Sequence, residues 1–142
     1  MSDTPTFAGL GLAPSLLEAL AARGITEPMP VQAAAIPPGL EGRDLLVQSR
    51  TGSGKTFAFG LPLLQRLQPE RHPQALVLAP TRELAQQVAL ELRRLRAVEV
   101  TLLVGGLGYG PQLKSLEKGC PVVVGTPGRV KDHLEPGTLD LS

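Results

Sequence analysis

The chain has 142 residues, of which 42% are hydrophobic and 19% charged, so it should fold as one globular domain at most. Its formal net charge of +1 excludes a strongly basic protein that holds nucleic acid by charge alone, and 3% aromatic residues argue against a base-stacking platform. The single cysteine, Cys120, excludes an internal disulfide and a cysteine-rich zinc site. The sequence has neither an apolar run of about 20 residues nor a signal-peptide pattern, so we expect a cytoplasmic protein with no membrane partner.

Two short helices are predicted in the N-terminal part, after a loose lead-in over the first eleven residues. Pro14 suits the first turn of a helix, where its missing N–H is not needed, and Gly24 is typical of a residue that ends one. A second helix should begin at Pro30 and end at Pro37–Pro38, because proline interrupts helical hydrogen bonding. Gln32 lies in its first turn. Its amide could accept a hydrogen bond from adenine N6 and donate one to N7, although a solvated helix residue is the plainer interpretation.

The stretch Ser49–Thr56 reads Ser-Arg-Thr-Gly-Ser-Gly-Lys-Thr and ends in the second half of the phosphate-binding pattern G-x-x-x-x-G-K-[ST]. Serine stands where the pattern has its first glycine. Upstream, Asp44–Gln48 is predicted to be a short buried strand, and downstream residues 57–67 have apolar side chains at helical spacing. In this context backbone N–H groups and the helix dipole point at phosphate oxygens. Lys55 would reach the outer phosphates and the Thr56 hydroxyl would bind Mg²⁺. The alternative is a Gly/Ser turn with a coincidental lysine.

After the glycine loop, strands and helices alternate regularly. The predicted strands are Ala75–Leu78, Glu99–Val104 and Pro121–Val124, and the predicted helices cover residues 80–96, 111–118 and 126–134. Cys120 should be a small core or strand-entry residue, and the tail after residue 134 should be a loop. This alternation predicts an α/β fold, with a parallel sheet covered by helices on both faces.

In such a sheet the strand-to-helix turns lie at one edge, where ligands bind. Three of these turns carry groups suited to anions: threonines that can cap a helix, arginines that pair with phosphate, and glycines that allow close approach. They are Pro80–Arg82, Gly105–Gly106 and Thr126–Arg129. Because one nucleotide cannot use all of them, a second, extended polyanion is the expected partner. The alternative is that they are ordinary caps and surface arginines.

Taken together, the motifs resemble those of the N-terminal RecA-like domain of a DEAD-box ATP-dependent RNA helicase, from Phe7 to about Leu134. Residues 24–32 resemble the family's Q motif, with Phe7 as its upstream aromatic, and residues 49–56 are similar to motif I of a P-loop NTPase. Pro80–Ala85 matches motif Ia, Gly105–Gly106 and Gln112 resemble the GG element and the glutamine after it, and Thr126–Arg129 matches motif Ib. Ile25 and Met29 depart from the family, which usually has an aromatic residue and Ser or Thr at these positions.

The resemblance implies that the chain binds ATP, Mg²⁺ and the backbone of single-stranded or duplex RNA, within a helicase that unwinds or remodels RNA. The implied nucleotide-binding residues are Phe7, Ile25, Gln32, Ser49, Thr51, Gly52, Ser53, Gly54, Lys55 and Thr56. Lys55 and Thr56 are implied to be catalytic, and Thr56 is the implied Mg²⁺ ligand. The implied RNA-binding residues are Pro80, Thr81, Arg82, Gly105, Gly106, Thr126, Gly128 and Arg129.

The 142 residues contain neither the Asp-Glu-Ala-Asp motif of the family, nor its Ser-Ala-Thr motif, nor its second RecA-like domain. We therefore expect a partial domain cut before the acidic motif, with a Q-motif region at 1–40 and the other motifs at 41–142. Such a chain should have a gap in its sheet beside Asp44–Gln48 and should not hydrolyse ATP alone. The alternatives are a non-hydrolysing nucleotide- and RNA-binding module, or a fragment of another P-loop NTPase such as a DNA helicase or a kinase.

Overall fold

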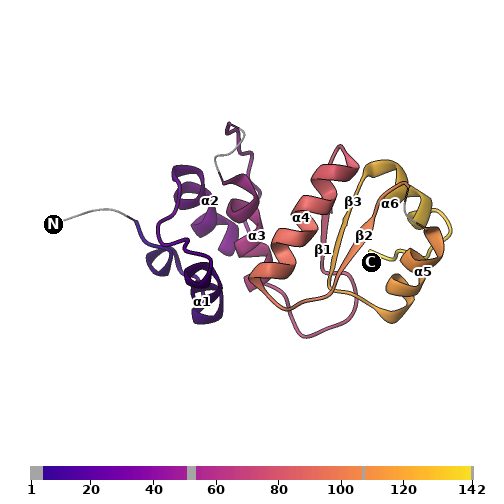
Figure 1. Ribbon diagram of the computed structural model, residues 1–142, viewed down its shortest axis with the longest axis horizontal. Helices are drawn as coiled ribbons and strands as arrows, with labels where there is room; N and C mark the ends of the chain where they lie inside the picture. The colour runs from indigo at the N-terminus through magenta and orange to yellow at the C-terminus, as the bar shows by residue number, and fades with distance from the viewer. Residues whose placement is uncertain (1–4, 51–53, 107, 142) are drawn as a thin grey trace. The chain divides into compact units, whose positions relative to one another are not determined.

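The computed structural model describes residues 5–50, 54–106 and 108–141, and Figure 1 shows their secondary structure. The contacts within the chain divide it into two compact units. The first unit comprises Met1–Arg66 with Arg94–Arg96, and the second comprises Leu67–Arg93 with Ala97–Ser142. In the described ranges, no helix is both long enough and apolar enough to cross a membrane.

The first unit is helical in its described residues. Its elements are a 3-10 helix, η1 (Ala8–Leu10), followed by α1 (Pro14–Ala22), α2 (Pro30–Leu40) and α3 (Lys55–Gln65). Both α1 and α2 begin at proline, as predicted. The prediction of a loose lead-in was wrong for its described residues, because Phe7 is buried and Ala8–Leu10 form η1. Burying the Phe7 side chain removes a large apolar area from water, which helps to offset the entropy lost in ordering this segment.

The predicted end of α2 was also wrong, because Pro37 and Pro38 lie inside the helix and the helix continues to Leu40. Proline lacks a donor but keeps its carbonyl. The Pro37 carbonyl accepts the N–H of Glu41 at 3.2 Å, and the Pro38 carbonyl accepts the N–H of Arg43 at 3.1 Å. The last turn therefore closes through the acceptors that proline still provides.

The segment Asp44–Gln48 was predicted to be a buried strand, and this prediction was wrong. Residues 43–50 form no strand, and Leu45, Leu46 and Val47 are all exposed, Leu46 completely. A strand is defined by hydrogen bonds to a neighbour. The described part of the first unit contains no other strand that could supply them.

The second unit contains a three-stranded parallel sheet in the order β1-β3-β2. The strands are β1 (Ala75–Leu78), β2 (Val100–Leu103) and β3 (Val122–Gly125), and the helices are α4 (Arg82–Leu95), α5 (Tyr109–Lys118) and α6 (Pro127–Leu134). The prediction of an α/β fold with a parallel sheet is confirmed. Each predicted strand and helix of this unit is present, with its ends shifted by at most two residues.

Helices lie on both sides of the sheet, with α4 on one side and α5 and α6 on the other (Figure 1). On the side of α6, Leu103 and Val123 pack with Val130 and Cys120. Cys120 is therefore a core residue, as predicted, and burial raises the pKa of its thiol.

Candidate functional site

In the first unit, the Gln32 side chain links the start of α2 to the last glycine of the loop. Gln32 Oε1 accepts the N–H of Met29 at 2.8 Å, and Gln32 Nε2 donates to the Gly54 carbonyl at 3.2 Å. Only 2% of the Gln32 residue is exposed. A side-chain amide has two N–H groups and two acceptor lone pairs, so these bonds leave one donor and one acceptor. That pair is the minimum that bidentate contact with an adenine edge requires.

Gly54 is the N-cap of α3 and has a left-handed conformation, with φ of +87°. A methyl group at this position would collide with the Gln32 amide and would lie 2.9 Å from the Met29 sulfur. The position therefore requires glycine both for its backbone angle and for the packing of Gln32 against it. Met29, where the resemblance predicts Ser or Thr, therefore has its sulfur beside the last glycine of the loop.

Lys55 and Thr56 occupy the first turn of α3, where the helix dipole favours anions. Lys55 Nζ donates to the Ser49 carbonyl at 2.6 Å, so its side chain spans the loop from end to start. Thr56 is half-buried. Three predicted loop residues, Thr51, Gly52 and Ser53, lie outside the described residues.

Phe7 and Ile25, which were also predicted to serve the nucleotide, lie in the described part of the first unit. Phe7 is only 4% exposed, which fits a bracing role in the core rather than direct contact with a ligand. Ile25 is half-buried, and its N–H donates to the Leu20 carbonyl at 2.9 Å, which fixes the chain after α1.

Among the residues that the structure describes, few side chains could hold Mg²⁺ on their own. No group of three His, Cys, Asp or Glu side chains that could hold a metal exists among the residues placed by the structure. The Thr56 hydroxyl is one oxygen ligand. Mg²⁺ usually keeps several waters and binds through phosphates together with one or two protein oxygens. Thr56 therefore fits an ion that arrives with a nucleotide.

In the second unit, the carboxyl ends of the strands meet at one edge of the sheet. The Ala79 N–H, just after β1, donates to the Gly125 carbonyl at 3.0 Å, and the Thr126 N–H, just after β3, donates to the Leu103 carbonyl at 3.0 Å. The three predicted turns therefore start side by side, as the parallel topology required.

The first two turns touch directly. Gly106 has φ of +86°, and a methyl group added there would collide with Arg82 Nη1, so the guanidinium lies against the glycine turn. Thr81 Oγ1 accepts the N–H of Leu84 at 3.2 Å, which confirms the predicted cap of α4. Pro80, Thr81, Arg82 and both glycines of the turn are exposed.

The third turn begins α6. Thr126 is at the N-cap position, but its side chain makes no cap hydrogen bond, so the prediction that it caps the helix through its hydroxyl was wrong. Its extended backbone and the proline that follows start the helix without that bond. Gly128 is exposed, and the Arg129 side chain is 20% exposed.

Behind these turns lies a polar cluster that the sequence indicated only in part. Gln112 Nε2 donates to the Val104 carbonyl at 3.0 Å, and Gln112 Oε1 accepts from Arg129 Nη1 at 3.3 Å. His133 Nε2 lies 3.0 Å from the same oxygen. Gln112 was noted only as part of a motif, and His133 and Tyr109 were missed. The available signal was spacing, because His133 follows Arg129 by four residues and so shares its face of α6.

Burial shapes the electrostatics of this cluster. His133 is completely buried and its ring stacks on Tyr109, with ring centroids 4.3 Å apart. Burial lowers the pKa of His133, the positive charge of Arg129 lowers it further, and Asp132 opposes both. The neutral imidazole is therefore favoured at pH 7.

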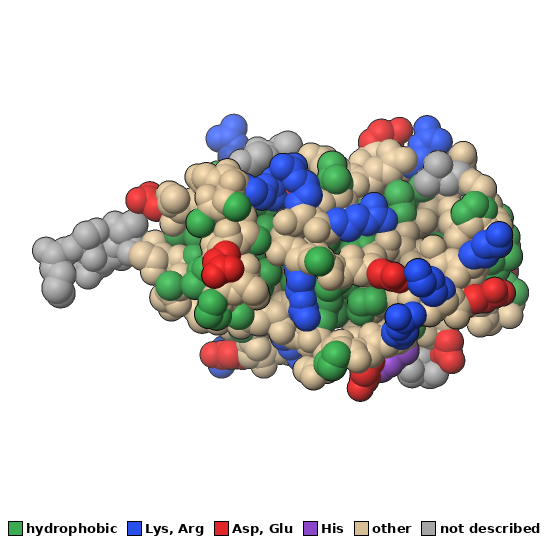
Figure 2. Space-filling model, turned by 60° about the horizontal axis from the view of Figure 1, so that its bottom comes forward, with side chains coloured by type: hydrophobic (Ala, Val, Ile, Leu, Met, Phe, Trp, Pro, Cys, Tyr) green, Lys and Arg blue, Asp and Glu red, His purple; other side chains and the backbone are tan. Residues whose placement is uncertain are grey.

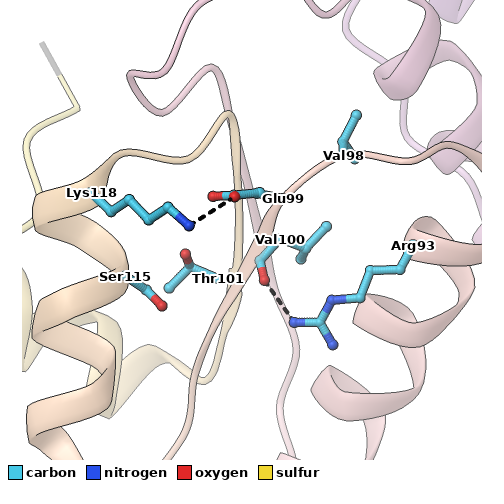
Figure 3. Close-up of a pocket in the computed structure, with 7 residues that line it drawn as sticks. All are labelled: Arg93, Val98, Glu99, Val100, Thr101, Ser115 and Lys118. Atoms are coloured by element: carbon cyan, nitrogen blue, oxygen red, sulfur yellow. Dashed lines mark hydrogen bonds and ion pairs between the residues drawn. The ribbon is translucent and has the colours of Figure 1, made fainter.

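A hollow of about 400 Å³ lies elsewhere on the second unit, at the start of β2 (Figure 3). Lys118 and Glu99 form an ion pair of 3.4 Å on one side of it, and Arg93 donates to the Val100 carbonyl at 2.6 Å on the other. These residues flank the amino end of the strand, away from the turns at the carboxyl ends. The hollow is therefore separate from the candidate site.

Figure 2 bears on how the chain could hold a polyanion. On the face drawn there, Lys and Arg side chains are interspersed with acidic and apolar ones. This agrees with the net charge of +1 and favours a few placed phosphate contacts over a broad positive field.

Comparisons with known proteins agree with the motifs. The family model described as "DEAD/DEAH box helicase" matches residues 29–141. The chain is 56% identical to the ATP-dependent RNA helicase DeaD of Escherichia coli, over 96% of its own length. It is 44% identical to the human ATP-dependent RNA helicase DDX50, again over 96% of its length. A crystal structure of a DEAD box protein from the hyperthermophile Methanococcus jannaschii superimposes with a TM-score of 0.91 at 39% identity, over 96% of this chain and 38% of that one.

The relatives are much longer than this chain. It covers 23% of the E. coli protein and 20% of the human protein. The chain therefore spans less than a quarter of the length of these curated relatives.

Proposed function

The chain belongs to the DEAD/DEAH box helicase family, and from this premise we propose that it forms the part of an ATP-dependent RNA helicase that binds ATP and the RNA backbone. The observation that carries the proposal is the edge of the second unit, where Arg82 lies against the Gly105–Gly106 turn and Arg129 lies in the first turn of α6. Exposed backbone at glycine together with two arginines suits a run of phosphates, because backbone contact needs charge and close approach but no base readout.

The nucleotide contacts are proposed for the first unit. Gln32 would read the adenine edge with the donor and acceptor left by its internal bonds. The loop from Ser49 to Thr56 would hold the phosphates, with Lys55 on the outer ones and Thr56 on a nucleotide-borne Mg²⁺. Ile25 would pack against the adenine, and Phe7 would brace this region from the core side.

We propose that the 142 residues alone do not hydrolyse ATP. Hydrolysis requires a carboxylate that orients water, together with charge stabilisation of the transition state. The sequence lacks the family's acidic motif, and in the full helicase a second RecA-like domain would supply further groups. RNA-stimulated ATP hydrolysis by this chain that disappears in Lys55→Ala would contradict this.

Calorimetry with a non-hydrolysable ATP analogue and Mg²⁺ tests the nucleotide site. We expect ATP-analogue binding to exceed GTP-analogue binding, and to be lost in Lys55→Ala and Gln32→Ala. Gln65→Ala is a matched control in the same unit, because Gln65 also accepts from a backbone N–H, that of Ala13 at 2.6 Å, and donates to a carbonyl, that of Gly11 at 2.9 Å. If Gln32→Ala and Gln65→Ala lose equal affinity for the ATP analogue, the loss reflects lower protein stability and not the loss of adenine recognition by Gln32.

Binding of single-stranded RNA tests the edge of the second unit. Arg82→Ala should weaken binding and reduce the slope of log K against log salt by about 0.7, the value for one phosphate contact to a single strand. Arg71→Ala is the control, since Arg71 is also exposed but precedes β1 at the opposite end of the sheet. If both variants bind alike, or if DNA binds as well as RNA, the assignment to RNA-backbone recognition fails.

A further inference from the structure

The side chain of Gln112 lies between two of the turns proposed to contact RNA. Its Nε2 donates to the carbonyl of Val104, the residue just before Gly105, and its Oε1 accepts from Arg129 Nη1. Gln112 itself is buried and cannot touch RNA. One amide therefore joins the glycine turn to the arginine of the next turn.

The orientation of this amide follows from partners whose roles are fixed. A backbone carbonyl can only accept, so the atom facing Val104 must be the NH₂ group. A guanidinium can only donate, so the atom facing Arg129 must be the oxygen. A flipped amide would lose both bonds and leave buried polar groups unpaired.

This orientation also fixes the state of His133. Because Gln112 Oε1 accepts, His133 Nε2 must carry a proton and donate to it at 3.0 Å. On the other side of the ring, Nδ1 of this tautomer is an acceptor and lies 3.2 Å from Thr138 Oγ1, whose one proton is donated to the His133 carbonyl at 2.9 Å. Tyr109 stacks on the ring face. The imidazole is thus held by the hydrogen bond from Nε2 and by the stacked ring.

Arg129 is constrained on several sides and still partly open. Its Cζ lies 5.7 Å from the centre of the Tyr109 ring, its Nε is 3.6 Å from Asp132 Oδ2, and its Nη1 donates to Gln112. The side chain remains 20% exposed. An arginine fixed before binding loses less side-chain entropy when it pairs with a phosphate.

We propose that His133 is a positioning residue for the RNA-binding edge: it holds the amide of Gln112, which in turn ties the Gly105–Gly106 turn to Arg129. This inference rests on the proposed RNA-binding function. It adds that the affinity for RNA depends on a buried hydrogen-bond donor, His133 Nε2, which does not itself touch RNA.

Two substitutions of His133 separate this role from simple loss of packing. His133→Gln can place an amide donor where Nε2 was and so keep the bond to Gln112. His133→Asn is shorter, so its amide reaches only the Nδ1 side, near Thr138, and leaves Gln112 Oε1 without that donor. Both variants are uncharged and both lose the ring stacked on Tyr109.

The test uses the 142-residue chain and a fluorescein-labelled oligouridylate, with binding followed by anisotropy and folding by thermal unfolding. We expect His133→Asn to weaken RNA binding by about three- to tenfold, the range for one hydrogen bond, and His133→Gln to restore most of it. Arg129→Ala should cost less in the His133→Asn background than in the wild type, because Arg129 is then already loosened.

The outcomes distinguish the proposed RNA-binding function from the positioning role of His133. If Arg129→Ala and Arg82→Ala each leave RNA binding unchanged in the wild-type background, the proposed function fails. If those two variants weaken binding but His133→Asn and His133→Gln bind RNA equally well, or lose affinity only in proportion to their stability, the positioning role of His133 is refuted.

Discussion

The two glycines of the Gly105–Gly106 turn should respond very differently to alanine. Gly106 has φ of +86°, and a methyl group there would meet the Arg82 guanidinium, whereas nothing lies within 4 Å of a methyl group at Gly105. We predict that Gly106→Ala destabilises the protein and that Gly105→Ala does not.

The expected difference can be estimated from the backbone. A non-glycine residue in the left-handed region costs about 1–2 kcal/mol. Both substitutions restrict the unfolded chain equally, so that contribution of about 0.4–1 kcal/mol cancels between them. The collision with Arg82 adds little, because the end of a long side chain can move aside. Gly106→Ala should therefore be about 1–2 kcal/mol less stable than Gly105→Ala.

Urea unfolding followed by circular dichroism measures this difference. With a slope of about 2 kcal/mol per M, the midpoints should differ by about 0.5–1 M. The pair Gly106→Ala and Arg82→Ala, made singly and together, shows how much the collision contributes, and we expect additivity within about 0.5 kcal/mol. Equal midpoints for Gly105→Ala and Gly106→Ala would refute the reasoning from backbone conformation.

Three further predictions concern the core, the exposed segment and the buried histidine. Gly125→Ala should cost about 1–3 kcal/mol, because its methyl group would lie 2.5 Å from the Leu103 carbonyl oxygen, whereas Gly128→Ala, with nothing within 4 Å, should be close to neutral in the same urea assay. Leu46→Lys should change the free energy of unfolding by less than about 0.5 kcal/mol, because Leu46 is fully exposed; a loss of several kcal/mol would mean that the side chain is buried after all. Burial lowers the pKa of His133, so the unfolded chain takes up its proton first as the pH falls. The free energy of unfolding should therefore decrease below the ordinary pKa of 6.5, and this decrease should be shallower in His133→Gln when urea midpoints are compared between pH 7 and pH 5.

Local sequence was enough to predict most of the second unit. The apolar runs at Ala75–Leu78 and Pro121–Val124, with turn residues after them, predicted two strands, which the structure contains as β1 (Ala75–Leu78) and β3 (Val122–Gly125). Because the strands alternate with helices, their carboxyl ends had to meet at one edge, so the order of the elements was enough to place the turns together. The family could also be predicted, because its motifs are short and continuous in sequence.

Wherever non-local contacts decide the outcome, only the tertiary structure could give the answer. Asp44–Gln48 has the composition of a strand, but a strand needs a hydrogen-bonded neighbour, and the described part of its unit offers none. The contact between Gln32 and Gly54 joins residues 22 positions apart, and that between Gln112 and His133 joins residues 21 positions apart. Composition and periodicity report the preference of a segment for a conformation. Strand pairing, side-chain burial and the orientation of a buried amide depend on which residues, distant in sequence, lie beside a segment. Tertiary packing determines those neighbours.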